Sequence, residues 1–370
     1  MSYQSALDQL SSSHNLRTIP ADTAGLQVAD LSTNDYLGLG TTVGLRSEFL
    51  QQLTAENALF SASASRLLAA NQHDFNRLET LLSQLYSRHI LLFNSGYHAN
   101  VGAISSLASE GRTLILADKL VHASIIDGMV LSRAPFERFR HNDAAHLERL
   151  LAKHAADYER IIIVTESVFS MDGDIAPLEE IAAVKRRYAN TLLYVDEAHA
   201  FGVLGQRGLG LCSGMPDVDV IIGTLGKAAA SAGAFAACRT IAVRDYLINR
   251  ARSFIFSTAI PPINCAWSRF VIEHILRMDA ERARLHRLGA LLQKCTGAAT
   301  PSHIQPLIVG SSAKALELSA KMRAEGFKVL PIRTPTVPPG TERLRFSLSL
   351  EVTEEQLQRL STIMPTLINA

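Results

Sequence analysis

The sequence lacks the features that would tie it to a membrane, a nucleic acid or a metal. Its 370 residues carry a formal net charge of +1, so no basic excess points to nucleic acid or a membrane surface. The four cysteines, Cys212, Cys238, Cys265 and Cys295, lie far apart and have no zinc-like spacing. No segment approaches 18 consecutive apolar residues, and the N-terminus shows no basic stretch followed by an apolar one. We therefore expect a soluble cytoplasmic protein with reduced cysteines and no metal.

Several signatures of other enzyme classes are also missing. "GTLGKA" (223–228) is not a P-loop, because Ile221 stands where a glycine is required and Ala228 where a hydroxyl is required. "GLGLCSG" (208–214) has neither the spacing nor the place of a dinucleotide-binding turn. The sequence contains no His-Glu-x-x-His and no Gly-x-Ser-x-Gly. These absences argue against P-loop, Rossmann, zinc-protease and α/β-hydrolase chemistry.

The middle of the chain alternates short apolar runs with segments of helical periodicity. Because many residues in the runs are β-branched, we predict buried strands, with amphipathic helices between them at 143–158 and 177–190. Such alternation predicts an α/β fold with a mainly parallel sheet that is covered on both faces. The predicted strands are 89–96, 112–118, 160–166, 191–197 and 219–224.

The last hundred residues have a different pattern. A long helix is expected over 269–295, followed by strands at "HIQPLIVG" and "RLRFSLSL" around a helix at 312–326. This order is typical of a small α+β domain that begins near Pro261-Pro262. We predict an N-terminal segment (1–45), a large domain (46–262) and a small C-terminal domain (263–370).

Ligands of mainly parallel sheets bind at the carboxyl ends of the strands, so the residues that follow each run are the candidates. The turn at Gly96 and Tyr97 leads into a predicted helix, whose N-terminal N–H groups can hold a phosphate. His122 follows the next run and could stack on a flat ring or act as an acid or base. Taken alone, each could equally be an ordinary turn or packing residue.

Asp196 and Lys227 follow two further runs and complete the pattern. An acid at the end of a buried strand needs a cation or a donor, and a protonated pyridine nitrogen supplies both. Lys227 lies among Gly, Ala and Ser, where crowding would favour a neutral, nucleophilic amine. His199 is close enough to Asp196 to reach another substituent of the same ring. This set is what pyridoxal 5'-phosphate (PLP) requires, although Asp196 could instead cap a turn and Lys227 could be an ordinary lysine.

Segments from end to end of the chain resemble the α-oxoamine synthases, which are fold-type I PLP-dependent transferases. The family condenses an amino acid with an acyl-CoA and releases carbon dioxide. The resemblance is carried by "NDYLGL" (34–39), "NSGYHAN" (94–100), "VHASIIDG" (121–128), "TESVFSMDGDIAPL" (165–178), "DEAHAFGVLG" (196–205), "GTLGK" (223–227), "FIFSTAIPP" (254–262) and "RTPTVPPGTERLRFSLS" (333–349).

The resemblance implies a role for each matching residue. Lys227 is similar to the lysine that binds PLP covalently, Asp196 to the acid at the pyridine nitrogen, and His122 to the histidine stacked on the ring. These three and His199 form the implied catalytic set. The other implied cofactor contacts are Gly96, Tyr97 and Thr224 at the phosphate, Ser170 with His199 near the phenolic oxygen, and Ser257 and Thr258 from a partner subunit. The implied substrate-binding residues are Arg17, Asn34, His122, Thr336 and Arg345, with Arg345 suited to a carboxylate by its fork of donors.

Three segments narrow the expected reaction. "RTIP" (17–20), "IQPLIVG" (304–310) and "TPTVPPGTERLRFSLS" resemble those family members that join L-alanine to pimeloyl-CoA or a pimeloyl-carrier protein in biotin synthesis. The products are 8-amino-7-oxononanoate, CO2 and free CoA or carrier. A homodimer with shared active sites is implied. The alternative within the family is an enzyme such as 2-amino-3-oxobutyrate CoA ligase, which uses glycine and acetyl-CoA.

The chain departs from the family pattern at three glycine-rich segments. It has "SASASR" (61–66), "HAFG" (199–202) and "GKAAASAGA" (226–234), each with alanine in place of glycine near the expected site. Alanine adds a methyl group and does not freely adopt positive φ. The substitutions leave open altered acyl specificity, weakened activity or a catalytically silent binding protein. A cofactor-free structural protein is the remaining alternative, and it would be colourless.

Overall fold

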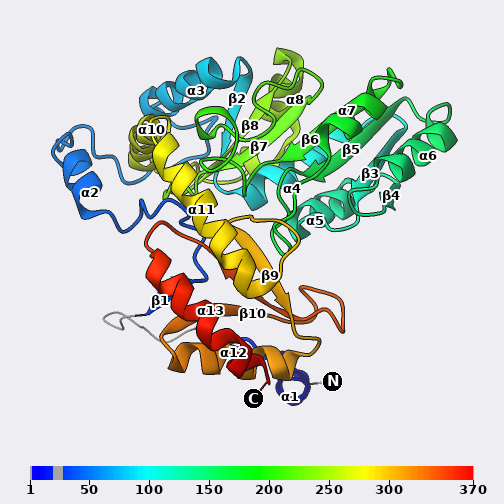
Figure 1. Ribbon diagram of the computed structural model, residues 1–370. Helices are drawn as coiled ribbons and strands as arrows, with labels where there is room; N and C mark the ends of the chain where they lie inside the picture. Colours follow the sequence, from blue (N-terminus) through cyan, green and yellow to red (C-terminus); the bar gives the residue numbers. More distant parts are fainter. Residues whose placement is uncertain (1, 20–27, 370) are drawn as a thin grey trace. The chain divides into compact units, whose positions relative to one another are not determined.

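The computed structural model describes residues 2–19 and 28–369, and these residues form two compact units (Figure 1). Unit 1 comprises the described residues of Met1–Leu37, Ser170–Asp174 and Ala280–Ala370, and unit 2 comprises Gly38–Phe169 and Ile175–Asp279. Pro20, part of the segment at 17–20, lies outside the described residues.

Unit 2 is built on a sheet that, in the described part of the chain, has seven strands in the order β2-β8-β7-β6-β5-β3-β4. Only β8 runs antiparallel to its neighbours β2 and β7, so the prediction of a mainly parallel sheet is confirmed. The strands are β2 His89–Phe93, β3 Thr113–Asp118, β4 Phe136–Phe139, β5 Arg160–Glu166, β6 Thr191–Asp196, β7 Val220–Thr224 and β8 Ala234–Cys238.

Helices cover both faces of this sheet. On one face a buried apolar cluster joins Ala103 of α4, Met129 of α5 and Leu247 of α8 to alternate strand residues such as Ile162. On the other face α3 packs its Tyr86 ring 5.4 Å from Phe235 of β8. The helices of unit 2 are α2 Val43–Leu50, α3 His73–Tyr86, α4 Gly96–Leu107, α5 Ala123–Ser132, α6 Ala144–His154, α7 Leu178–Lys185, η1 Gln206–Gly208, α8 Ile241–Arg250, α9 Arg252–Ile255 and α10 Pro262–Ile275.

Unit 1 contains a second, smaller sheet with the strand order β1-β10-β11-β9. β1 pairs parallel with β10, while β11 pairs antiparallel with β10 and β9. The elements are α1 Tyr3–Ser12, β1 Ala29–Leu31, β9 Ile304–Ile308, α12 Ser312–Ala324, β10 Phe327–Ile332, β11 Arg343–Ser347 and α13 Glu354–Asn369, together with α11, Asp279–Thr296. The α+β pattern predicted for the C-terminal residues is therefore present.

The continuous helix predicted over 269–295 is wrong. The segment is divided between α10, which ends at Ile275, and α11, which begins at Asp279. Between them the N–H groups of Arg277 and Met278 bond to carbonyls only three residues back, which tightens the last turn. Asp279 then provides a residue that favours a new helix start.

The predicted domain boundaries at 45/46 and 262/263 stay a prediction, since compact units are groups of contacting residues rather than independently folding domains.

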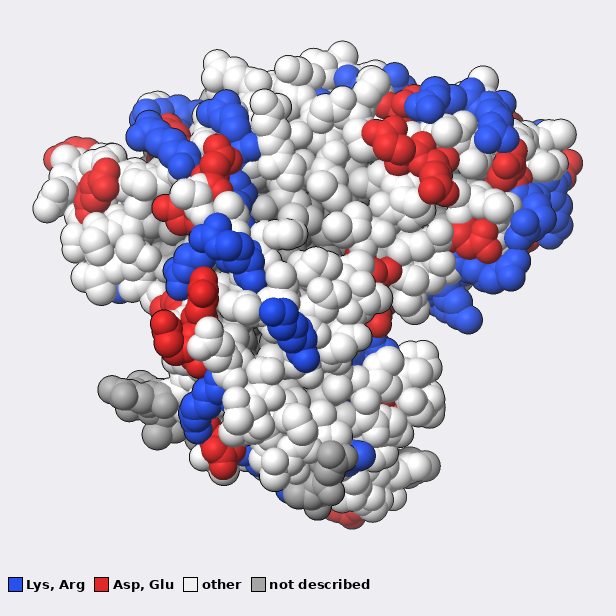
Figure 2. All heavy atoms as spheres, in the orientation of Figure 1, with Lys and Arg blue, Asp and Glu red and all other residues white. Residues whose placement is uncertain are grey.

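On the face that Figure 2 shows, basic and acidic side chains of the described residues lie intermixed. Among the described helices, none has the length and apolar character needed to cross a bilayer.

Candidate active site

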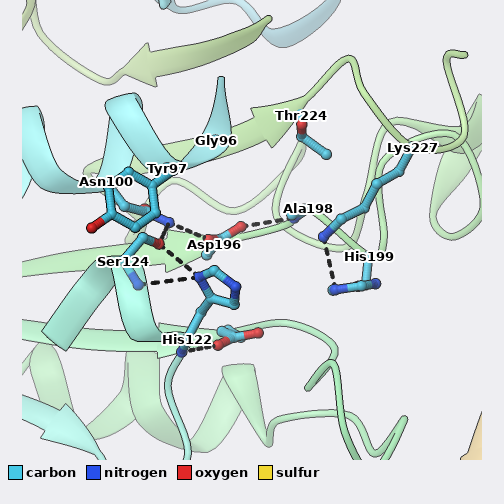
Figure 3. Close-up of a pocket in the computed structure, with 11 residues that line it drawn as sticks. Gly96, Tyr97, Asn100, His122, Ser124, Asp196, Ala198, His199, Thr224 and Lys227 are labelled. Atoms are coloured by element: carbon cyan, nitrogen blue, oxygen red, sulfur yellow. Dashed lines mark hydrogen bonds between the residues drawn. The ribbon is translucent and has the colours of Figure 1, made fainter. Parts of the chain in front are cut away.

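One cavity of unit 2 lies at the carboxyl ends of its parallel strands. Its volume is about 160 Å³, which is enough for one aromatic ring, because an engineered cavity of about 150 Å³ holds benzene. Figure 3 shows its lining side chains, with Lys227 and His199 together and Asp196 near Asn100. The lining residues are Gly96, Tyr97, Asn100, His122, Ser124, Glu166, Asp196, Ala198, His199, Thr224 and Lys227.

The turn between β2 and α4 forms one end of the cavity. Ser95 caps α4, and its hydroxyl accepts a hydrogen bond from the backbone N–H of His98. A Cβ at Gly96 would lie 3.7 Å from the Oγ1 of Thr224, so the glycine leaves open space beside that hydroxyl. A helix N-terminus next to a hydroxyl and a glycine is well suited to a phosphate group.

Asp196, at the end of β6, has a fixed carboxylate. One oxygen accepts from the backbone N–H of Ala198 at 2.8 Å, and the other accepts from the side-chain amide of Asn100 at 2.7 Å. Asp196 is 5% exposed, so these donors compensate much of the cost of burying its charge. The carboxylate can still accept a further hydrogen bond from a ligand in the cavity.

His122 is the N-cap residue of α5 and borders the same cavity. Its Nδ1 accepts from the backbone N–H of Ser124 at 3.2 Å, so the neutral ring carries its proton on Nε2. Burial lowers the pKa of His122 below its ordinary value, and the charge of Lys227 acts in the same direction while that of Asp196 opposes it. A neutral imidazole suits stacking on an aromatic ring.

Glu166 is a second buried acid of the cavity. It ends β5, pairs in register with Asp196 of β6, and accepts a hydrogen bond from the backbone N–H of His122. Burial, followed by the charge of Asp196, raises the pKa of Glu166 well above its ordinary value. Glu166 therefore favours its neutral form.

Lys227 follows β7 and meets His199, which comes from the turn after β6. Nζ of Lys227 and Nε2 of His199 form a hydrogen bond of 2.7 Å. The alanines after Lys227 differ in how well they suit the local backbone. Ala228 and Ala229 are buried, while Ala230 adopts φ +46°, a conformation that glycine would adopt more readily.

The other residues predicted for the site lie elsewhere in the fold. Ser257 and Thr258 belong to unit 2 but stand outside the cavity lining, and the carbonyl of Thr258 accepts from the side chain of Asn94. The remaining predicted residues, Arg17, Asn34, Ser170, Thr336 and Arg345, belong to unit 1.

Unit 1 brings these remaining residues together in two groups. Nε of Arg345 donates to the carbonyl of Ser170 at 2.6 Å, and its Nη2 donates to Oδ1 of Asn34 at 3.2 Å. Arg17 donates to the hydroxyl of Thr336 at 2.9 Å. Arg345 is 3% exposed, so its orientation is fixed by its neighbours.

Four lining residues were not predicted: Asn100, Ser124, Glu166 and Ala198. Signals for three of them were available in the sequence. Asn100 stands four residues after Gly96, on the same helix face, and Ser124 stands two residues after His122. Glu166 ends a buried strand as Asp196 does, and the same reasoning about a buried acid applies to it.

Comparisons with known proteins show the family of this chain. A family model described as aminotransferase class I and II matches residues 27–363. An 8-amino-7-oxononanoate synthase of Haemophilus ducreyi is 47% identical over 350 residues, which cover 90% of each chain.

Two solved structures have the same fold. A serine palmitoyltransferase from S. paucimobilis, with a bound PLP–myriocin aldimine, is 26% identical with a TM-score of 0.87, covering 98% of this chain and 96% of that one. An 8-amino-7-oxononanoate synthase from Francisella tularensis is 28% identical with a TM-score of 0.77, covering 92% of this chain and 98% of that one.

The chain therefore belongs to the aminotransferase class I and II family, whose fold is that of the fold-type I transferases. Within this family it is an enzyme of the α-oxoamine synthase group, as the sequence motifs indicated.

Proposed function

We propose that this enzyme binds PLP and condenses L-alanine with a pimeloyl thioester to form 8-amino-7-oxononanoate. The observation that carries the proposal is a single ring-sized cavity that places Lys227, Asp196 and the Gly96 turn around one space. The similarity to two 8-amino-7-oxononanoate synthases supports the choice of substrates.

The lining residues fit PLP group by group. The Gly96 turn and Thr224 would hold the phosphate, and Asp196 would keep a proton on the pyridine nitrogen. The neutral ring of His122 would pack on the cofactor ring, and His199 would bond to the phenolic oxygen. When bound, PLP supplies an electron sink for the carbon atom that is deprotonated.

Lys227 would have two roles in the reaction. Its amine would hold the cofactor covalently in the resting enzyme, and would move a proton to or from the α-carbon of the amino acid. His199, 2.7 Å away, would orient this amine. The overall reaction joins the α-carbon of L-alanine to the thioester carbonyl, and the thiol and CO2 leave.

The substrate-binding residues of this proposal are those that the family resemblance implies. Arg345, already oriented by Ser170 and Asn34, has further donors that could bind the carboxylate of the amino acid. We assign Arg17 and Thr336, which bond to each other, to the acyl substrate.

We also propose that the enzyme is a homodimer. Residues 64–65 pair with 258–259, and Thr258 bonds to Asn94 next to the Gly96 turn. Large apolar side chains on these segments are exposed, with Phe60 75%, Leu68 78% and Phe256 70% accessible. Exposed large apolar side chains favour a protein interface, and a second copy would bring its Ser257 and Thr258 to the shared site. Light scattering would measure the mass in solution, which should be that of two chains.

We further propose a cytoplasmic location, with which the free cysteines and the thioester substrate are consistent.

The function is tested by the visible spectrum and by thiol release. The purified protein with PLP should be yellow, and its spectrum should change on addition of L-alanine. Thiol release should be fastest with L-alanine and a pimeloyl thioester, either CoA or carrier protein. Faster release with glycine and acetyl-CoA would refute the assignment, and a yellow protein that does not respond to any amino acid would indicate a silent binding protein.

A further inference from the structure

Helix and strand periodicity bring three buried polar residues together beneath the proposed cofactor site. Asn100 stands one turn after Gly96 on α4 and faces the sheet. Tyr194 and Asp196 are two residues apart on β6, so both point to the face that α4 covers. Figure 3 shows Asn100 beside Asp196 and Ser124.

The direction of each hydrogen bond in this group is determined by chemistry. The Asp196 carboxylate only accepts, so the atom of Asn100 that faces it at 2.7 Å is the amide nitrogen. The Asn100 oxygen then faces the Tyr194 hydroxyl at 2.7 Å, which must donate. Burial, followed by the charge of Asp196, raises the pKa of Tyr194 well above its ordinary value, so this donor keeps its proton.

A second branch runs from Asn100 to His122. The other amide proton of Asn100 is donated to the Ser124 hydroxyl at 2.9 Å. Ser124 in turn lies 2.7 Å from Nδ1 of His122 and can donate to it. Both donors of Asn100 are thus used, one for each of two groups that line the cavity.

Asn100, Tyr194 and Ser124 are each at most 1% exposed. Because these groups are buried, the loss of one partner carries a large cost, and the hydrogen bonds hold the orientations tightly.

From this network we propose that Asn100 is a positioning residue that fixes the carboxylate of Asp196 and the ring of His122 for the cofactor, and that Tyr194 fixes the orientation of the Asn100 amide. The inference rests on the proposed PLP site. It adds to that site a residue that acts through Asp196 and His122.

The test is a titration of the apoprotein with PLP, followed by visible absorbance and by the circular dichroism of the bound cofactor. Asn100→Leu keeps similar bulk and removes both donors. It should weaken PLP binding about ten- to one-hundred-fold, because hydrogen bonds to charged groups contribute more than neutral ones. At saturating PLP, the visible circular dichroism per bound cofactor should also change, since Asp196 no longer holds one orientation.

Two further variants separate positioning from general damage. Ser106→Ala is the matched control, because Ser106 is buried on the same helix and its hydroxyl donates to the α4 carbonyls of Gly102 and Ala103, away from the network. It should keep the wild-type PLP affinity and dichroism. Tyr194→Phe removes one hydroxyl and should weaken PLP binding about two- to ten-fold, in keeping with a neutral hydrogen bond.

The outcomes also distinguish this inference from the proposed function. A wild-type protein that gives no visible band with PLP would reject the cofactor site itself. A wild-type protein that binds PLP, with unchanged affinity and dichroism in Asn100→Leu, would overturn the positioning role alone. If Asn100→Leu does not fold, Tyr194→Phe decides, and an unchanged affinity in that variant overturns the inference.

Discussion

Gly202 offers a quantitative test of how the loop that carries Lys227 is packed. Gly202 has φ +86°, and a Cβ at this position would lie 2.6 Å from the Cβ of Ala228. Carbon atoms pack at about 3.5–4.0 Å, so Gly202→Ala forces the two methyl groups about 1 Å too close. Ala228 is one of the alanines that replace a family glycine, and it directly follows Lys227.

Two terms determine the expected cost of Gly202→Ala. Backbone strain at positive φ costs about 1–2 kcal/mol, and overpacking of a buried site costs about 1–3 kcal/mol. The free energy of unfolding should therefore fall by about 2–5 kcal/mol in total. Ala228→Gly alone should cost only about 1 kcal/mol, from added backbone freedom.

The double variant Gly202→Ala/Ala228→Gly separates the two terms. It removes the overlap but keeps the strain, so the coupling free energy should be about 1–3 kcal/mol in the stabilising direction. Urea unfolding can be followed by the fluorescence of Trp267, the single tryptophan, whose indole donates to the carbonyl of Ala230 in the same loop at 2.9 Å. Effects that add to within about 0.5 kcal/mol would refute the packing argument.

Three further predictions concern the site and its support. Lys227→Ala should lose the covalent attachment of PLP that borohydride reduction makes permanent. Its turnover should fall by at least about 10³-fold, and full turnover by this variant would contradict the role of Lys227. Gly96→Ala should fold normally, since its methyl would lie 3.7 Å from Thr224, but the methyl occupies the phosphate position and should weaken PLP binding about tenfold. Gly44→Ala is its control, because a Cβ at Gly44 would have no atom within 4 Å. If the two variants bind PLP equally well, the phosphate does not lie at the Gly96 turn. Burial raises the pKa of Glu197 from 4.5 to about 7, so the native state binds the extra proton between these values. The contribution of Glu197 to the free energy of unfolding should therefore be fully present below pH 4.5 and be lost, by roughly 3 kcal/mol, as pH rises from 4.5 through 7. Glu197→Gln should flatten this dependence in urea unfolding measured from pH 5 to 8, and an unchanged slope would refute it.

The elements that could be predicted are those whose pattern is local. The runs that became β2, β3, β5, β6 and β7 contain consecutive apolar residues, many of them β-branched, which suit a strand buried on both faces. In contrast, β8 is the segment Ala234–Cys238, where alanines give little strand preference. Its place beside β2 depends on antiparallel pairing with residues about 145 positions earlier in the chain, such as Phe93 with Ala234.

The site residues that could be predicted are likewise those that a local pattern marks. Gly96, His122, Asp196 and Lys227 each follow a recognisable strand, and the rule for strand ends was sufficient to select them. Asn100 lies inside a helix, where its partners on β6 and α5 are not visible from the neighbouring residues.

By itself, the sequence determined the strands β2, β3, β5, β6 and β7, the chemical groups at their ends and, through its motifs, the family. These depend on local periodicity and on residue type. Only the tertiary structure decided that Asp196, His122 and Lys227 surround one cavity, and that Asn100 joins the first two by hydrogen bonds. Such contacts join residues far apart in the chain, and they form only when the sheet order brings the strand ends together.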